Sequence, residues 1–420
     1  MNQSFILRSV TNLYPNSEFY KKDIDVLIKD GNIAALGENI KAKGTEEIDM
    51  TGQYLTPGFM DLNANFGEPG EETKEDIETG SRAAASGGFT GVALMPNTNP
   101  PIHSKSEISF VVNRSRGNVV NIYPLGCLSK NREGEDLAEL YDMSLSGARA
   151  FTDGDRPVTD SGLMSRALLY AKGFNGLIFS NPEDSSIAGK GQMNEGVMST
   201  LLGLKGIPAL AEEMAISRDL YLAEYNDSPI HFSTISTRGS VDLIREAKKK
   251  GIKVTCDVAA HNLVFNEEQL SGFDSNFKVK PPLRTKDDIR ALISGLKDGT
   301  VDAIVSQHTP HEIEFKNVEF ETASYGIIGL QTVLPLALKT KLSPELLVEK
   351  LCVAPRKILS VPLFGLKENT PADFIVWNKD TEWEFNATAN LSKSSNSPLL
   401  NQKLKGRVTF VCNNNQVFIP

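Results

Sequence analysis

The feature that most constrains the fold of this chain is the alternation of short apolar runs with helix-like stretches in its middle part. Eight apolar runs follow one another between residues 56 and 365: GFMDLNA, TGVALMP, VVNIYPL, GARAFTD, GLIFSNP, PIHFSTI, IKVTCDV and DAIVSQH. Most are separated by stretches that favour helix, such as EETKEDIETGSRAAASG, GSVDLIREAKKKG and TKDDIRALISGLKDG. Strands that alternate with helices in this way predict an α/β fold of the (β/α)8 TIM-barrel type, with a doubly wound open sheet as the alternative.

The two ends of the chain have a different pattern. Residues 1–55 and 366–420 contain short runs with β-type alternation, and the pair Asp30-Gly31 stands between two apolar runs as a hairpin signal. We therefore expect both ends to meet in one small β-sandwich domain. On this division residues 56–365 form the barrel.

Composition and charge limit the partners that the chain can have. Its 420 residues include 44 Lys and Arg against 53 Asp and Glu, a net charge of −9, which argues against binding to nucleic acid or to an anionic membrane. No apolar run is long enough for a transmembrane helix, and MNQSFILRSV lacks the pattern of a signal peptide. The four cysteines are far apart in the sequence, which predicts free thiols in a reducing cytoplasm.

Polar residues close most of the apolar runs, at the face of a barrel where chemistry takes place. They are Asn63, Asn65, Asn97, Asp153, Asn181, Thr234, His261, Gln307 and His308. Two side chains that stand two residues apart at a strand end, such as Asn63 and Asn65, point the same way. A barrel metallohydrolase would carry several His, Asp or Glu at such positions to hold divalent cations. This set has a single carboxylate.

Several long motifs resemble those of dihydroorotases of the bacterial and multifunctional-complex type, within the cyclic amidohydrolases. PGFMDLNANFGEPG is similar to the family's PGFIDLHVHLREPG, and GGFTGVALMPNTNPP to its GGFTTVVCMPNTNPP. FKVKPPLR, SQHTPHEIEFK and YGIIGLQT follow in the family's order, and TPADFIVWN and SKSSNSP resemble its C-terminal β domain. The resemblance covers essentially the whole chain and implies the same barrel with a β domain.

The resemblance also implies positions for zinc, and this sequence departs from them. The two zinc-binding histidines of the family's first motif fall on Asn63 and Asn65, and two later histidines fall on Asn181 and Thr234. The metal-bridging aspartate is kept as Asp153, although FTDGDRPV departs from the family's order just after it. Neutral amide and hydroxyl oxygens are weak zinc ligands, so no cofactor is expected; a hydrated cation on Asp153 is the alternative.

Catalytic and substrate-binding positions follow from the same motifs. The family's catalytic aspartate falls on Gln307, which has no titratable carboxylate and cannot accept a proton from water. The arginine that would hold the substrate carboxylate falls on Gly67, so the bidentate clamp is lost. Asn97 and His308 match two substrate contacts and are expected to remain as remnants of the substrate site.

These losses predict a non-catalytic member of the family, in the pyrimidine biosynthesis pathway, that serves as a structural or assembly partner. The resemblance suggests aspartate transcarbamoylase as that partner and a homodimer as the quaternary state. An active dihydroorotase or other cyclic amidohydrolase with a rearranged site is the first alternative. The second is a small-molecule binding protein that uses the old pocket. Lys278 and Lys280 in FKVKPP are expected to form a solvated basic pair, with a role in anion binding as the alternative.

Overall fold

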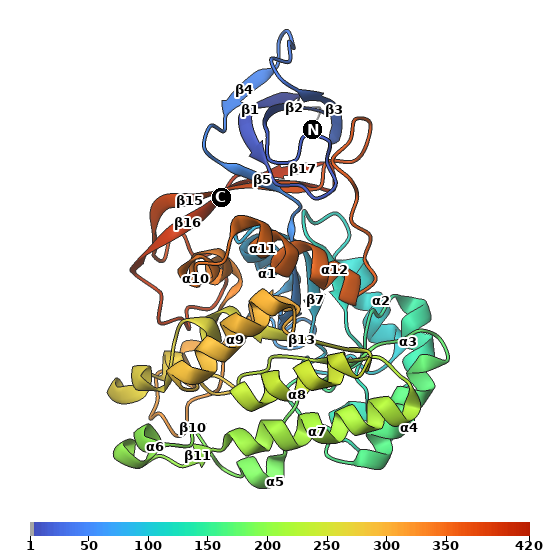
Figure 1. Ribbon diagram of the computed structural model, residues 1–420, viewed down its shortest axis with the longest axis vertical. Helices are drawn as coiled ribbons and strands as arrows, with labels where there is room; N and C mark the ends of the chain where they lie inside the picture. Colours follow the sequence, from blue (N-terminus) through green and yellow to red (C-terminus); the bar gives the residue numbers. More distant parts are fainter. Residues whose placement is uncertain (1–3) are drawn as a thin grey trace.

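Eight parallel strand segments form a closed barrel in the computed structural model, which describes residues 4–420 (Figure 1). Seven are regular strands: β6 (Phe59–Ala64), β7 (Phe89–Leu94), β8 (Asn121–Pro124), β9 (Ile178–Ser180), β12 (Ile230–Phe232), β13 (Val254–Ala259) and β14 (Ala303–Val305). The fourth place in the ring is taken by Phe151, which bridges Gly126 on one side and Ile178 on the other. A bridge from Ala64 to His308 closes the ring. The predicted barrel is confirmed, and the open sheet is excluded.

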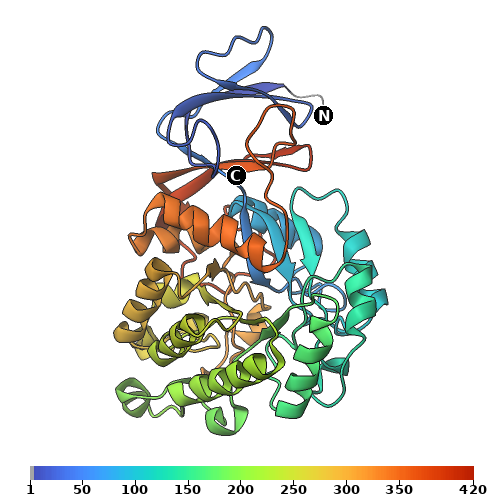
Figure 2. The same cartoon turned by 45° about the vertical axis from the view of Figure 1, so that its right-hand side comes forward.

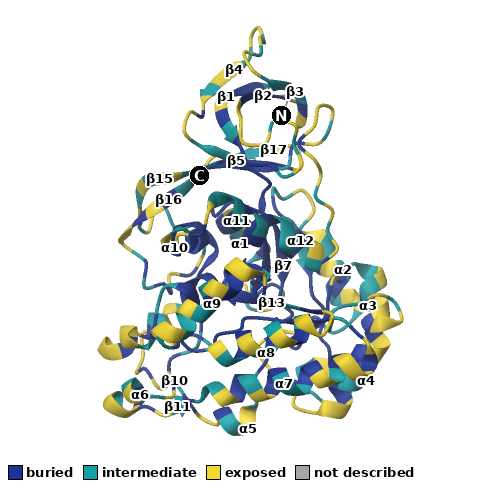
Figure 3. Ribbon diagram, viewed as in Figure 1, coloured by how far each residue is buried: buried dark blue, intermediate teal, exposed yellow. Residues whose placement is uncertain are grey.

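Helices surround the barrel on its outside. The longer ones are α1 (Ile77–Ser86), α2 (Lys105–Arg114), α4 (Ser161–Lys172), α7 (Ala209–Asn226), α8 (Arg238–Lys249) and α9 (Lys286–Asp298). Shorter ones are α3 (Leu140–Ser146), α5 (Ser185–Ala188), α6 (Val197–Leu202), α10 (Val333–Lys339), α11 (Pro344–Val348) and α12 (Ala354–Ile358). The longer helices bury residues against the barrel, as in α8, where Val241, Ile244 and Ala247 are buried (Figure 3). Within residues 4–420 no helix is both long and apolar enough to span a membrane.

The two ends of the chain share one sheet. Its strands are β1 (Phe5–Asn12), β2 (Asp23–Lys29), β3 (Asn32–Gly37), β4 (Glu46–Asp49), β5 (Tyr54–Thr56), β15 (Phe374–Phe385), β16 (Gln402–Asn413) and β17 (Gln416–Phe418). Antiparallel pairing of β5 with β15 joins the two ends, and Figures 1 and 2 show this β-sandwich domain beyond one end of the barrel. Asp30 and Gly31 form the expected hairpin turn, with φ of +49° and +73°.

One long connection ties the β domain to the barrel loops. The segment between β15 and β16, residues 386–401, leaves the β domain and contacts the loops that follow β6 and β14. The Ser394 hydroxyl donates to the Lys74 carbonyl at 2.8 Å, and the Asn396 amide donates to the Thr309 carbonyl at 2.9 Å. A small outer pair of strands, β10 (Met193–Asn194) and β11 (Gly206–Ile207), carries α5 and α6 away from the barrel.

Candidate active site at the carboxyl ends of the barrel strands

A polar cavity of about 210 Å³ lies at the carboxyl ends of the barrel strands. Six of the positions expected from the sequence line it: Asn63, Asn65, Asn97, Asn181, Thr234 and Gln307. Asp155, Lys280 and Tyr325 also line this inner cavity. The barrel therefore brings together residues from six different strand ends, as its topology requires.

A second cavity of about 370 Å³ adjoins the first, with Asn65, Asn97, Asp155 and Thr309 common to both. Gly67, where the resemblance implies the lost arginine, lines this outer cavity. The charged residues of its lining are Glu71, Lys74, Arg132, Asp155 and Arg156. The inner cavity, whose charged lining residues are Asp155 and Lys280, thus opens toward an outer cavity with more charged residues.

The amide and hydroxyl side chains at the expected zinc positions bond to the protein itself. Asn63 Nδ2 donates to Ser233 Oγ at 3.2 Å and to Thr234 Oγ1 at 3.1 Å. Asn65 Nδ2 donates to the His308 carbonyl at 3.1 Å, and Asn181 Nδ2 donates to the Gly154 carbonyl at 3.0 Å. Two expected ligand positions, 63 and 234, are therefore joined to each other by a hydrogen bond.

Asp153, the expected metal-bridging carboxylate, accepts two hydrogen bonds from a neighbouring loop. Its Oδ1 accepts from the Ser129 backbone N–H at 2.9 Å, and its Oδ2 accepts from the Ser129 hydroxyl at 2.5 Å. Burial raises the pKa of the Asp153 carboxyl, while the bonds from Ser129 oppose that rise. Asp153 does not line either cavity. Its role in this structure is to hold the segment that begins at Ser129.

The donor set does not fit the zinc that the family uses. In the part of the chain that the structure describes, no three His, Cys, Asp or Glu residues lie together so that they could hold a metal ion. His231 is buried beneath the cavity, with Nε2 2.9 Å from Asp257 Oδ2 and Nδ1 2.8 Å from Thr255 Oγ1. His261 is also buried, which lowers its pKa to about 4. Neither imidazole lines either cavity.

Two residues of the inner cavity have strained backbone. Thr234 and Gln307 lie in the left-handed region, with φ of +62° and +49°. This conformation is unfavourable for a β-branched residue such as Thr, and strain of this kind is concentrated at functional sites. Gln307 Nε2 donates to the Lys280 carbonyl at 2.8 Å. The position of the family's base thus has an amide in a fixed orientation.

Gly67 cannot be replaced by a larger residue without moving the backbone. Its φ is +53°, and a Cβ added there would lie 2.4 Å from the Glu71 carbonyl oxygen and 2.8 Å from that of Glu75. Side chains rarely adopt this φ, and real Cβ contacts are not this short. The conformation of the loop between β6 and α1 therefore leaves no room for an arginine side chain at residue 67.

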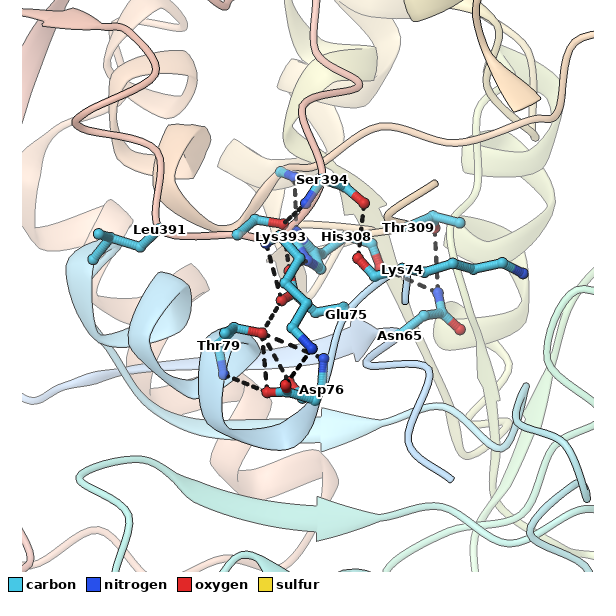
Figure 4. Close-up of polar contacts among 12 residues, drawn as sticks. Asn65, Lys74, Glu75, Asp76, Thr79, His308, Thr309, Leu391, Lys393 and Ser394 are labelled. Carbon is cyan, nitrogen blue, oxygen red and sulfur yellow. Dashed lines mark hydrogen bonds and ion pairs between the residues drawn. The ribbon is translucent and has the colours of Figure 1, made fainter. Parts of the chain in front are cut away.

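His308 lines neither cavity and lies beside Glu75 (Figure 4). Its Nδ1 accepts from the Gly329 backbone N–H at 3.2 Å, so the N–H is on Nε2, which lies 3.4 Å from Glu75 Oε2. Glu75 is fully buried and accepts from the hydroxyls of Thr79 and Ser392 and from the Lys393 backbone N–H. Glu75 thus fastens the 386–401 segment to the barrel, and the matched histidine lies against Glu75 and lines neither cavity.

A second histidine of the same motif, which the sequence analysis did not select, lines the outer cavity. His311 Nε2 bonds to the Tyr325 carbonyl at 2.9 Å, and its Nδ1 has no hydrogen-bond partner. Burial lowers the pKa of His311, so this ring is neutral near pH 7. The signal was present in SQHTPH, where two histidines stand three residues apart and the sequence does not say which one faces the cavity.

Comparison with known proteins places these features in a family. The family described as Dihydro-orotase-like matches residues 52–240. A dihydroorotase of Geobacter sp. (strain M21) is 45% identical over 401 residues, which are 94% of either chain, and one of Acetivibrio thermocellus is 42% identical over 402 residues. The chain belongs to the dihydroorotase-like family. Among solved structures, the L-hydantoinase of Arthrobacter aurescens has a TM-score of 0.86 at 22% identity, covering 99% of this chain and 96% of its own, which shows the shared fold.

The similarity to these relatives corrects the functional expectation. A non-catalytic protein that serves as an assembly partner was predicted from the replaced side chains. Relatives that are 42–45% identical over 94% of this chain are named dihydroorotase, and this finding contradicts the prediction. The prediction was wrong because it gave a few replaced side chains more weight than the similarity of the whole chain.

Proposed function

We propose that the chain is a dihydroorotase-class cyclic amidohydrolase with a rearranged site, which acts on the ring C–N bond of a small cyclic ureide that carries a carboxylate. The whole-length similarity to proteins named dihydroorotase carries this proposal. The strained backbone at Thr234 and Gln307 supports a functional site at the same strand ends. A cavity of about 210 Å³ is smaller than the range of roughly 300–1,000 Å³ for drug-sized ligands and suits a single ring.

The lining of the inner cavity is suited to a ligand with both N–H and carbonyl groups. Asn65 Oδ1 and Asn97 Oδ1 have no hydrogen-bond partner in the protein, although buried polar atoms are almost always paired. Ureide N–H groups are the kind of donor that such oxygens lack. Lys280 offers a cation at the same cavity, and its Nζ lies 2.8 Å from Glu183 Oε1.

Orientation and proton transfer are the contributions that these residues can make. A site that holds the open-chain ureide in a ring-like conformation brings its nitrogen close to the carboxyl carbon, and such positioning can supply a large part of a rate enhancement. Asp155 supplies a carboxylate that lines both cavities and can accept a proton from the ligand or from water. No step is assigned to a metal, because the residues present do not fit one.

Enzyme assay of the purified chain tests the proposal. We expect interconversion of dihydroorotate and N-carbamoyl aspartate above the uncatalysed rate, followed by chromatography in both directions. The matched variant is Asn97→Leu, which removes an amide that bonds to no other protein group and should leave folding intact while turnover falls. Binding of dihydroorotate without any turnover, or no binding at all, would contradict the proposed activity.

Three further expectations remain proposals about the same protein. The first is a homodimer, which size-exclusion chromatography of the purified chain tests. The second is an association with aspartate transcarbamoylase in a common pathway, which size-exclusion chromatography of a mixture of the two proteins tests. The third is a reducing, cytoplasmic location. The four cysteines are all buried as free thiols, which suits that location.

A further inference from the structure

We propose that Arg156 binds the carboxylate of the ligand from the outer cavity, in place of an arginine at residue 67. This inference rests on the proposed function, because it assigns the charged end of the same ligand. Arg156 follows the fourth strand position of the barrel, three residues after Asp153, and its side chain is exposed in the lining of the outer cavity together with Gly67 and Asn97.

The position of the Arg156 loop is fixed relative to the inner cavity. A Cβ on Gly154 would lie 1.8 Å from Asn97 Oδ1, so the backbone at residue 154 packs directly against the Asn97 amide. The Arg156 backbone N–H donates to the Asp153 carbonyl at 3.2 Å, and Asn181 Nδ2 holds the Gly154 carbonyl. The base of the Arg156 side chain is therefore anchored two residues from the contact with Asn97.

A charge count singles out Arg156 among the cations of the outer cavity. The lining has three cations, Lys74, Arg132 and Arg156, and two carboxylates, Glu71 and Asp155, which leaves one positive charge in excess. Lys74 Nζ lies 2.9 Å from Glu71 Oε1, and Arg132 is paired with Asp155.

Arg156 has no ion pair among the described residues. Its guanidinium Nη1 donates to the Arg132 carbonyl at 3.5 Å. The excess charge is thus on the one side chain that no carboxylate neutralises.

The chemistry of the guanidinium group suits this role. Arginine presents a planar set of N–H donors that matches a carboxylate in a bidentate arrangement, and such charge-assisted bonds are stronger than neutral ones. The cation of the inner cavity, Lys280, already has Glu183 as its counter-ion. A ligand whose ring lies in the inner cavity beside Asn97 can direct its carboxylate outward toward Arg156. The inner and outer cavities would then bind the two halves of one ligand.

The test compares two ligands with three variants by isothermal titration calorimetry. Dihydroorotate carries the ring and the carboxylate, whereas dihydrouracil has the ring alone. Arg156→Gln should weaken dihydroorotate binding by about ten- to hundred-fold, the loss expected for a charged hydrogen-bonded pair, and should leave dihydrouracil binding unchanged. Arg156→Lys should recover part of the loss. Arg116→Gln, an equal charge change at an exposed residue outside both cavities, is the control and should behave as wild type.

The outcomes separate this inference from the proposed function. If wild type binds and turns over dihydroorotate but Arg156→Gln binds it as tightly as Arg116→Gln does, the role of Arg156 is refuted and the proposed function stands. An equal loss for both ligands in Arg156→Gln also refutes it, because that pattern indicates a disturbed cavity. If wild type binds neither ligand, the proposed function fails and this inference fails with it.

Discussion

Replacement of Gly67 by alanine tests the claim that the loop between β6 and α1 has no room for a side chain. Gly67 has a φ of +53°, and an added Cβ would meet two backbone oxygens, those of Glu71 and Glu75, at 2.4 Å and 2.8 Å. Neither oxygen belongs to a flexible side chain, so the loop itself must move. Gly117→Ala is the matched control, because Gly117 has a φ of +85° and no atom within 4 Å of the added Cβ.

The expected cost has two parts. Left-handed backbone costs a residue with a Cβ roughly 1–2 kcal/mol, and both variants have this loss. Forcing atoms into a packed site adds about 1–3 kcal/mol in Gly67→Ala alone. We therefore expect the free energy of unfolding to fall by about 2–5 kcal/mol in Gly67→Ala and by about 1–2 kcal/mol in Gly117→Ala.

Denaturant unfolding followed by circular dichroism measures both changes, with the midpoints compared at an unchanged slope. Equal destabilisation of the two variants would show that contact with the Glu71 and Glu75 carbonyls costs nothing. That result would refute the claim that the loop has no room for an arginine side chain at residue 67. A Gly67→Arg variant with wild-type stability would refute it as well.

Three further predictions concern the residues around the site. Glu75→Ala should lower the free energy of unfolding by about 3–5 kcal/mol, because it leaves several buried donors unpaired. Denaturant unfolding measures this change, and a smaller loss than in Lys393→Ala would contradict the prediction. Burial raises the pKa of Asp61 to about 7, above its unfolded value, so the free energy of unfolding should fall as pH rises from about 4 to 7, and Asp61→Asn should flatten that slope. Ser129→Ala should increase hydrogen exchange at residues 129–134, since Asp153 then loses the hydroxyl donor; unchanged exchange would remove the anchoring role of Asp153.

The barrel could be predicted because its signal is local and repeated. Most strand ends were marked by a polar residue after an apolar run, and GSVDLIREAKKKG had the spacing of a helix that the structure places at Arg238–Lys249. The hairpin at Asp30-Gly31 was equally readable, since its turn needs two residues of positive φ. These features depend on neighbours in the sequence.

The finer site could not be predicted, because it depends on contacts between distant residues. Asn63 bonds to Thr234, which lies 171 residues further along the chain. His308 contacts Glu75 across a still longer separation in the sequence. The same holds for the 386–401 segment, whose polar sequence does not reveal that it packs on the loop before α1. The choice between His308 and His311 as the cavity residue depended on side-chain direction, which the motif does not encode.

Amide and hydroxyl hydrogen bonds occupy the strand ends where the resemblance to dihydroorotases implies zinc. Elemental analysis of protein purified after growth with added zinc tests it most directly. We expect well under one tightly bound zinc per chain. The side chains of Asn63, Asn65, Asn181 and Thr234 form hydrogen bonds within the protein, and Asp153 accepts from Ser129. Near-stoichiometric zinc in the wild type, lost in Asp153→Asn, would contradict it.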